Sequence, residues 1–304
     1  MNEKKILDVI PTIFSLDKSV VVGPGDDCAV LDLGGNKLFL MAVDQLVADI
    51  HYLPQTTSPA NIAKKLLKRN ISDIAAMGGT PAHALLTMQL SEKTGKNSNW
   101  IKEFLTAISD ESDLWGISIC GGDISSTKSE NDSFSLTITG WVDKENLCLR
   151  SNAEEGDLIF VTGLFGRSFF TQHHLTFTPR VEASNFLAGK FSNTMIDVSD
   201  GLLLDLARIA ESSTLAAVLD VSCIPGRDNA NDNEKISDGE DYELIFTVPP
   251  ALKESLFKQW PFKEIELTCI GQFSSGPVGQ IIEKNGELLY PLENRSGGFD
   301  HFKV

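Results

Sequence analysis

Apolar positions along the chain recur at two spacings, one typical of helices and the other of strands. The clearest helical pattern runs from Pro59 to Met77, where the apolar residues fall on one face. Ser58 suits an N-cap, Pro59 suits the first helical position, and the following pair of glycines ends the helix. The same spacing predicts three further helices, over residues 3–14, 100–114 and 252–260.

The helix predicted over residues 59–77 also carries polar side chains in a definite arrangement. Asn70 falls on the apolar face, where a buried amide needs hydrogen-bond partners. Asp73 lies one turn further on, and a buried carboxylate there would need a cation or several donors. The alternative for Asp73 is a helix-surface aspartate. The basic residues fall on the opposite face: Lys64, Lys65, Lys68 and Arg69.

Apolar runs bounded by glycine or polar residues predict strands in both halves of the chain. A further helix is expected from Ser199 to Ala210, and the polar residues 228–238 are expected to form a flexible loop. The polar run 143–146 is the best boundary, so we predict two α+β domains, residues 1–145 and 146–304. The predicted strands cover residues 20–22, 29–33, 38–43, 82–90, 117–120, 133–142, 157–162, 195–198 and 242–248.

Length and charge narrow the class of protein. The 304 residues favour two domains, and a hydrophobic fraction of 42% suffices for packed cores. The formal net charge is −16, with no visible basic patch, so nucleic-acid binding and a membrane-surface role are disfavoured. An acidic chain still binds a nucleotide where Mg²⁺ lies between its carboxylates and the phosphates.

The sequence also bears on location. No apolar run reaches the roughly 18 residues of a membrane span, and the first residues lack the apolar segment of a signal peptide. The five cysteines are far apart and include no CxxC pair, so neither a disulfide framework nor a zinc site is indicated. We therefore expect a reducing cytoplasm.

Short acidic motifs mark the predicted strand ends and helix starts. Six occur, and almost none contains a lysine or arginine. Hard divalent cations prefer such oxygen ligands. The pattern predicts that metal ions, rather than basic side chains, hold an anionic ligand. The motifs are Gly25-Asp26-Asp27, Val43-Asp44, Ser72-Asp73, Gly122-Asp123, Asp197-Val198-Ser199-Asp200 and Gly239-Glu240-Asp241.

Each motif also has an ordinary structural alternative. The loop at Asp27 could be a plain turn, Asp44 a strand terminator, and Gly122-Asp123 a hairpin turn. The paired glycines before Asp123 would equally let the backbone approach a ligand closely. Ser199 or Asp200 could cap the next helix, whose N-terminus is a natural phosphate site.

Known nucleotide-binding sequences are absent. There is no Walker A sequence, no glycine-rich dinucleotide fingerprint and no protein-kinase signature set. Among basic residues, Arg150 is the best candidate to meet a phosphate. His51 and Glu240 are further candidates, and their alternatives are an ordinary histidine and a solvated loop charge.

Taken together, the motifs resemble thiamine-monophosphate kinase, in the family's order and over nearly the whole chain. The stretches 70–78 and 239–244 are specific, and the last stretch supports this family over its relatives. The matching residues are Gly25–Val30, Val43–Val47, Asn70–Gly78, Gly121–Asp123, Ile196–Leu202, Gly239–Leu244 and Gly298–Phe302.

The resemblance implies a fold, a reaction and a set of site residues. It implies an N-terminal domain that pairs across a homodimer, and a C-terminal α+β domain that completes the substrate site. The implied reaction moves a phosphoryl group from ATP to thiamine monophosphate, with several Mg²⁺ ions. By position, the residues that look like metal ligands are Asp27, Asp44, Asp73, Asp123, Asp197 and Asp200. Those that look like ATP contacts are Gly122, Asp123, Arg150 and Ser199, and those that look like thiamine phosphate contacts are His51, Glu240 and Phe299.

The sequence departs from the family's usual residues at three places. Ala42 and Val43 precede Asp44 where hydroxyl side chains are common, so only backbone carbonyls could serve a metal there. Tyr52 stands where phenylalanine is common. Phe299 stands where tyrosine or tryptophan is common, so it can stack on a thiamine ring without donating a hydrogen bond.

For the reaction, we hypothesise direct in-line transfer assisted by Mg²⁺, with Asp73 the most critical ligand. The acceptor is a phosphate oxygen whose second pKa is about 6, so no general base is required. Two other classes stay open. One is a sister enzyme of the superfamily that uses ATP on another acceptor, and the other is a nucleotide-binding scaffold without turnover.

Overall fold

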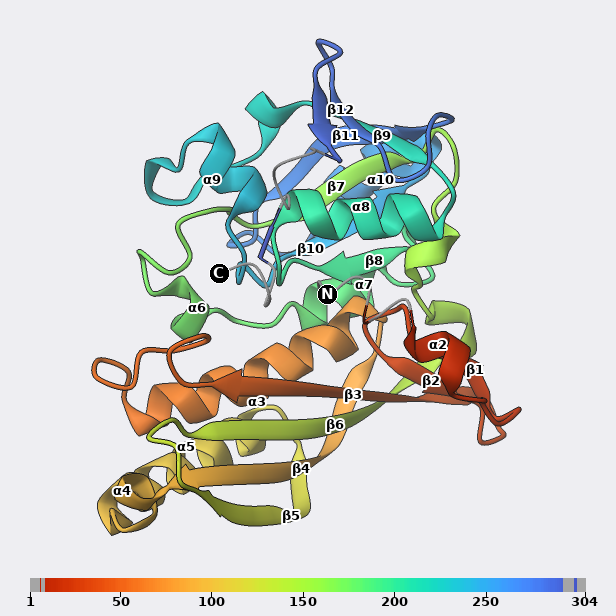
Figure 1. Cartoon of the computed structure of the whole chain (residues 1–304). Coiled ribbons are helices and arrows are strands. Elements are labelled where there is room, and N and C mark those ends of the chain that lie inside the picture. Colours follow the sequence, from red (N-terminus) through yellow and green to blue (C-terminus); the bar gives the residue numbers. More distant parts are fainter. Residues whose placement is uncertain (1–5, 7–8, 292–297, 300–304) are drawn as a thin grey trace.

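The computed structural model describes all residues except 1–5, 7–8, 292–297 and 300–304. The backbone forms two β-sheets, one in each half of the chain, with helices packed on them (Figure 1). The predicted α+β class is therefore confirmed. Within the described residues, no helix combines the length and the apolar character that crossing a membrane requires.

The first sheet consists of six strands, β1 Val20–Val22, β2 Ala29–Leu31, β3 Lys37–Val47, β4 Thr80–Ser91, β5 Ser118–Thr127 and β6 Ser133–Asp143. Their order across the sheet is β1-β2-β3-β6-β4-β5, and only the β4–β5 pair is parallel. Asp44 on β3 pairs with Leu136 on β6, which pairs with Leu86 on β4. This register fixes how far apart the acidic motifs of the sheet lie.

Two helices, α3 Pro59–Ala76 and α5 Ser98–Leu114, pack on one face of the first sheet. Alternate strand residues such as Leu40 and Leu136 point into this core, as the two-residue period of a strand requires. Ser58 caps α3 as predicted, because its Oγ accepts a hydrogen bond from Asn61 N at 3.2 Å. Among the described residues, none covers the other face of the sheet, which exposes apolar side chains such as Leu85.

The second sheet has seven strands in the order β13-β12-β9-β11-β7-β10-β8, and only β12 and β9 are parallel neighbours. Helices α8 Leu202–Ser212 and α10 Lys253–Gln259 pack on opposite faces. The central strands are thus covered on both sides, which explains their continuous apolar sequences. The strands are β7 Leu158–Thr162, β8 Met195–Asp197, β9 Ala216–Leu219, β10 Leu244–Val248, β11 Leu267–Ser274, β12 Ile281–Glu283 and β13 Leu288–Tyr290.

Shorter helices connect these elements. The α-helices are α2 Ile10–Ile13, α4 Glu92–Gly95, α6 His173–Thr176, α7 Val181–Leu187 and α9 Asp232–Ser237. The 3-10 helices are η1 Lys144–Asn146, η2 Arg150–Asn152, η3 Val221–Cys223, η4 Arg227–Asn229 and η5 Pro250–Leu252.

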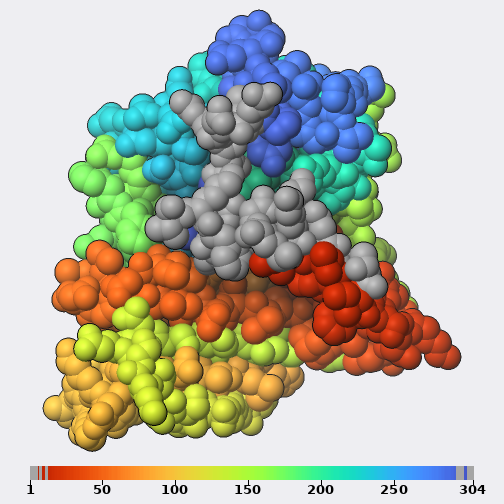
Figure 2. Space-filling model, viewed as in Figure 1, coloured from red at the N-terminus to blue at the C-terminus, as the bar shows by residue number. Residues whose placement is uncertain are grey.

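Helix α3 lies between the two halves and contacts β8, α6 and α7 of the second half (Figure 1). In Figure 2 the orange region of the first half lies directly beneath green atoms of the second half. Ser72 on α3 donates a hydrogen bond to Asp197 at the end of β8, at 2.6 Å. The second half therefore buries Lys65, although the sequence places this lysine on the face opposite the apolar one.

Two expectations about local structure are wrong, and a third falls partly outside the described residues. Strand β5 does not end at Cys120 but continues through Gly121–Asp123, because these residues pair with β4. Residues 228–238 do not form a loop throughout, since a capping box between Asn231 and Glu234 starts α9 there. The helix expected over 3–14 is described only in part, as α2.

The pairing of β5 with β4 makes a prediction about Gly122. A Cβ on Gly122 would lie 1.7 Å from Leu86 O, whereas one on Gly121 would meet nothing closer than Leu85 Cδ2 at 3.6 Å. We expect Gly122→Ala to displace β5 and to lower the free energy of unfolding by about 1–3 kcal/mol in urea titrations. The matched control Gly121→Ala should stay within about 0.5 kcal/mol. Equal losses in the two variants would contradict this explanation.

Candidate active site

Three carboxylates from different elements converge between the two halves. Asp27 lies in the loop before β2, Asp73 near the end of α3, and Asp197 at the end of β8. Each offers one oxygen, and these oxygens all lie within 4.8 Å of one another. We call these three residues the acidic cluster. Three of the six aspartates predicted from the sequence as metal ligands thus meet at one point.

The acidic cluster is electrostatically unsatisfied. Burial, followed by the charges of Asp44, Asp197 and Asp27, raises the pKa of Asp73 well above its ordinary value. Burial and the charge of Asp27 raise the pKa of Asp197 in the same way, although the Ser72 hydroxyl acts against the shift. Buried like charges favour a bound cation or protonation. An all-oxygen donor set of this kind fits a hard divalent ion such as Mg²⁺.

Arg150 reaches this site, as expected, but it contacts aspartates. Its Nη2 lies 2.5 Å from Asp27 Oδ1, and its backbone N donates to Asp26 Oδ2 at 3.1 Å. Burial and the neighbouring charge of Asp27 raise the pKa of Asp26 to about 7. The guanidinium therefore offsets the negative charge at one edge of the acidic cluster.

Asp44 lies next to the acidic cluster but is held by another arginine. Arg69 Nε and Nη2 lie 2.7 and 3.2 Å from the two Asp44 carboxylate oxygens. Asn70 Oδ1 accepts a hydrogen bond from Asp44 N at 3.1 Å, and its amide donates to Leu66 O at 2.8 Å. Asn70 thus has the partners that its buried position on α3 was predicted to need.

The backbone N–H groups at the start of α8 are hydrogen-bonded to a side chain of the same helix, Asp205. Asp205 Oδ2 accepts hydrogen bonds from the backbone N–H groups of Ser199, Asp200 and Gly201, at 3.1, 3.0 and 3.2 Å. Asp200 itself pairs with Arg208 Nη2 at 2.5 Å. This helix N-terminus was a candidate phosphate site from the sequence, but its donors are already engaged by Asp205.

Gly122 and Asp123 lie away from the acidic cluster. Asp123 on β5 pairs with Thr87 on β4, and three strand spacings of about 4.8 Å, or roughly 14 Å, separate β5 from β3. Thr87 alternates with the buried residues Leu86 and Met88, so Asp123 lies on the open face of the sheet. One copy of the chain does not bring this motif to the other aspartates.

The predicted substrate contacts His51 and Glu240 are joined by Lys65. The Lys65 ammonium donates to both Glu240 carboxylate oxygens at 2.7 Å and to His51 O at 2.6 Å. His51 Nδ1 in turn accepts a hydrogen bond from Val47 N at 3.0 Å. Lys65 therefore links one segment of each half across the interface.

Phe299, the third predicted substrate contact, lines a cavity of about 490 Å³ in the second half. Gly239, next to Glu240, lines the same cavity. Arg167 lies over the Phe170 ring at 4.1 Å from its centroid, and Phe169 stacks on His174 at 4.0 Å. The lining residues are Arg167, Phe169, Phe170, Glu234, Ser237, Asp238, Gly239, Gly298 and Phe299.

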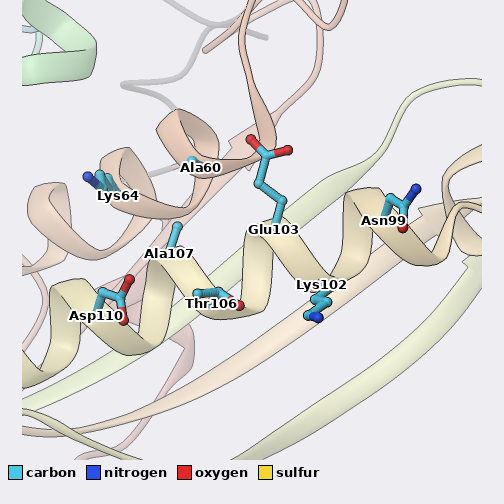
Figure 3. A pocket seen from close by; sticks show the side chains of 8 residues that line it. All are labelled: Ala60, Lys64, Asn99, Lys102, Glu103, Thr106, Ala107 and Asp110. Carbon is cyan, nitrogen blue, oxygen red and sulfur yellow. The ribbon is translucent and has the colours of Figure 1, made fainter.

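A second hollow, of about 430 Å³, lies between α3 and α5 (Figure 3). Lys64 and Lys102 contribute positive charge to it, and Glu103 and Asp110 contribute negative charge. No residue of the acidic cluster lines this hollow. Its positive and negative charges are balanced, so they favour neither an anionic nor a cationic ligand. This hollow is therefore not part of the candidate active site.

Several residues of the site were not identified from the sequence. Lys65 and Arg69 appeared as members of a basic helix face, and Asp205 and Arg208 appeared as ordinary residues of α8. The available signal was the position of Arg69, directly before the buried Asn70 on a helix that also carries Asp73. Spacing on one helix does not show what a second half of the chain will cover.

Comparisons with known proteins identify the class and then the family. The family profile "AIR synthase related protein, N-terminal domain" matches residues 25–142, and the fold described above is of this class. The thiamine-monophosphate kinase of Haemophilus influenzae is 33% identical over 95% of this chain and 94% of its own length. That of Escherichia coli K12 is 32% identical over 93% and 92%. The chain belongs to the thiamine-monophosphate kinase family and is thus a phosphotransferase.

A solved structure agrees with this assignment. The structure of AaThiL complexed with AMPPCP and TMP has a TM-score of 0.82 and 25% sequence identity to this chain. The match covers 99% of this chain and 97% of that one. Both halves therefore share the fold of that structure.

Lys65 gives the folded protein a measurable pH dependence. Burial lowers its pKa from 10.5 to about 8, although the charge of Glu240 acts against the shift. Below pH 8 both states are protonated. Between these pKa values the unfolded chain binds more protons, so the Lys65 contribution to the free energy of unfolding rises with pH, by about 3 kcal/mol in total. Urea unfolding should show that the free energy of unfolding of wild type, relative to that of Lys65→Met, increases between pH 8 and pH 10.5. A constant or decreasing difference between the two would contradict this.

Proposed function

We propose that the chain transfers the terminal phosphoryl group of ATP to the phosphate of thiamine monophosphate, giving ADP and thiamine diphosphate. The observation that carries the proposal is the acidic cluster, built by both halves beside the segments of Glu240 and His51. The related AaThiL was solved with AMPPCP, an analogue of ATP, and with TMP. These two ligands belong to the donor and acceptor classes of the proposed reaction.

The acidic cluster would hold Mg²⁺ through Asp27, Asp73 and Asp197. Bound there, Mg²⁺ would offset the charge of the phosphates and help to align them. Asp200 and Asp123 were also expected as ligands, but Asp200 is paired with Arg208 and Asp123 lies on the open sheet face. The three carboxylates of the acidic cluster would by themselves provide oxygen ligands for one ion.

The residues of the chain position the acceptor and need not remove a proton from it. The acceptor oxygen belongs to a phosphate monoester with a second pKa of about 6, so it is ionised near neutral pH. Near neutral pH, Lys65 supplies positive charge between the Glu240 and His51 segments. We therefore propose direct in-line attack on the terminal phosphorus of ATP, without a phosphorylated aspartate or histidine.

The cavity beside Glu240 suits the organic part of the acceptor. Thiamine carries a positively charged thiazolium ring and a flat pyrimidine ring. Phe169 and Phe299 offer aromatic faces, and Glu234 and Asp238 offer negative charge that exceeds the single positive charge of Arg167, which lies over the Phe170 ring. Cations and aromatic rings bind well in such surroundings. We propose that Phe299 stacks on one ring of thiamine.

The ATP contacts expected at Gly122 and Asp123 lie on the open face of the first sheet, where a second copy of the chain could cover them. The open face of the first sheet exposes Met41, Val43 and Leu85, with 39%, 65% and 49% of their surfaces exposed. An uncovered apolar sheet face of this kind favours a protein partner. A second copy packed on it would cover Asp123, so we propose a homodimer formed by residues 1–145, with residues 146–304 completing each acceptor site.

The acidic cluster predicts the effect of a single substitution. Asp73→Asn should lower kcat by at least about a hundredfold, because it removes one charge from the metal site. Its free energy of unfolding in urea should equal or exceed that of wild type, because the substitution also removes one of three carboxylates that repel one another. The exposed control Asp110→Asn should keep full turnover. Phosphorus NMR of the products, with and without thiamine monophosphate, separates this kinase from an ATP-using sister enzyme and from an inactive scaffold. Near-normal turnover of Asp73→Asn at saturating Mg²⁺ would refute the site.

The proposed dimer is tested by charge placed on the open face. Leu85→Glu should convert the dimer to a monomer in sedimentation velocity, because a buried unpaired carboxylate is costly. The control Leu114→Glu changes an apolar residue that is 74% exposed at the end of α5 and should leave the dimer intact. A dimer that persists in Leu85→Glu would exclude this face.

A further inference from the structure

Arg69 engages both carboxylate oxygens of Asp44. The contact is a bidentate salt bridge, with Nε–Oδ2 and Nη2–Oδ1 distances of 2.7 and 3.2 Å. The side chains of Arg69 and Asp44 are 12% and 25% exposed. Arg69 Nη1 also donates to Gln45 O at 3.2 Å. Paired geometry of this kind is among the strongest contacts that a carboxylate makes with a side chain.

With Arg69 in place, Asp44 has no carboxylate oxygen left without a cation partner, so it does not need a divalent ion. The two preceding residues, Ala42 and Val43, carry no side-chain oxygen. Among the described residues, the group of carboxylates close enough to share an ion contains Asp27, Asp73 and Asp197 but not Asp44. Both Asp44 oxygens already have a positively charged partner from the chain itself.

The Arg69 guanidinium has N–H groups that its contacts with Asp44 and Gln45 do not use. Its contacts with Asp44 and Gln45 use three of its five N–H groups. It lies on the face of α3 that the second half covers, next to the site where Lys65 meets Glu240. Two N–H groups are thus available for an anionic ligand at the junction of the two halves.

Tyr242 provides a second donor at the same junction. Its side chain is only 2% exposed, and among the described residues its hydroxyl has no hydrogen-bond partner. Its backbone N donates to Val198 O at 2.8 Å, which places it beside Asp197, and its ring stacks on Phe177. The charges of Arg69, Glu240, Asp44 and Asp197 all act on this hydroxyl. A buried hydroxyl without a partner is costly unless a ligand accepts its hydrogen bond.

We propose that Arg69 is a resident cation that takes the place of a divalent ion at Asp44 and, with the Tyr242 hydroxyl, binds the phosphate of the acceptor. The acceptor is assigned because Glu240 and Lys65, next to both donors, adjoin the cavity for its organic part. This contact rests on the proposed function. The replacement of an ion by Arg69 does not.

Counting bound Mn²⁺ tests the role of Arg69 without any substrate. Mn²⁺ takes the same oxygen ligands as Mg²⁺ and is counted by electron paramagnetic resonance on the full chain. We expect wild type and Asp44→Asn to bind equal numbers of ions, and Arg69→Met to bind one more per chain. Lys68→Met, which removes the same charge from the neighbouring residue, should match wild type. Loss of an ion in Asp44→Asn, or no gain in Arg69→Met, would overturn the proposal.

Calorimetric titration with thiamine monophosphate and with thiamine tests the Tyr242 contact. Tyr242→Phe should raise the Kd for thiamine monophosphate about tenfold and leave the Kd for thiamine unchanged. Its Tm should not fall, because the lost hydroxyl has no partner in the protein. Equal effects on both ligands, or none on thiamine monophosphate, would overturn the contact. A wild type that binds neither ligand would refute the proposed function as well, while the Mn²⁺ count would still decide the role of Arg69.

Discussion

The burial of charge on α3 is the constraint on which the rest of the structure depends. This helix packs on the first sheet and is covered by the second half, so its polar side chains lose water on both sides. Lys65 and Ser72 are buried and have partners in the second half, Glu240 and Asp197, whereas the buried Asn70 is paired within the first half, with Asp44. Since buried polar groups are costly when unpaired, Lys65 and Ser72 gain their side-chain partners only when the two halves dock.

The aspartates of the motifs divide into two groups by their partners. Asp27, Asp44 and Asp200 each have an arginine from elsewhere in the chain, namely Arg150, Arg69 and Arg208. Among the described residues, Asp73 and Asp197 form no such ion pair, and both have raised pKa values. The hypothesis that a metal ion serves these motifs therefore stays a prediction, and it depends most on Asp73 and Asp197, which have no basic partner among the described residues.

Much of the fold was predictable because the decisive signals are local. The cap at Ser58, the apolar face of α3 and the apolar runs of β3, β6 and β10 each determine their own element. The pairing of Lys65 with Glu240 was not predictable, because it depends on which face the second half covers, 175 residues away. Asp123 shows the same limit, since its motif matches the others in type while the sheet register carries it to the open face.

The convergence of Asp27, Asp73 and Asp197 works against the docking that produces it. Each comes from a separate element, and like charges this close repel one another in surroundings with little water. Contacts at the interface oppose that repulsion: Ser72 with Asp197, Ser184 with Ala75 O, and Lys65 with Glu240. None of these contacts supplies a cation to Asp73, so a bound cation or protonation would relieve the repulsion at this point. A site that is stable but incomplete in this way is suited to an ion that arrives with its nucleotide.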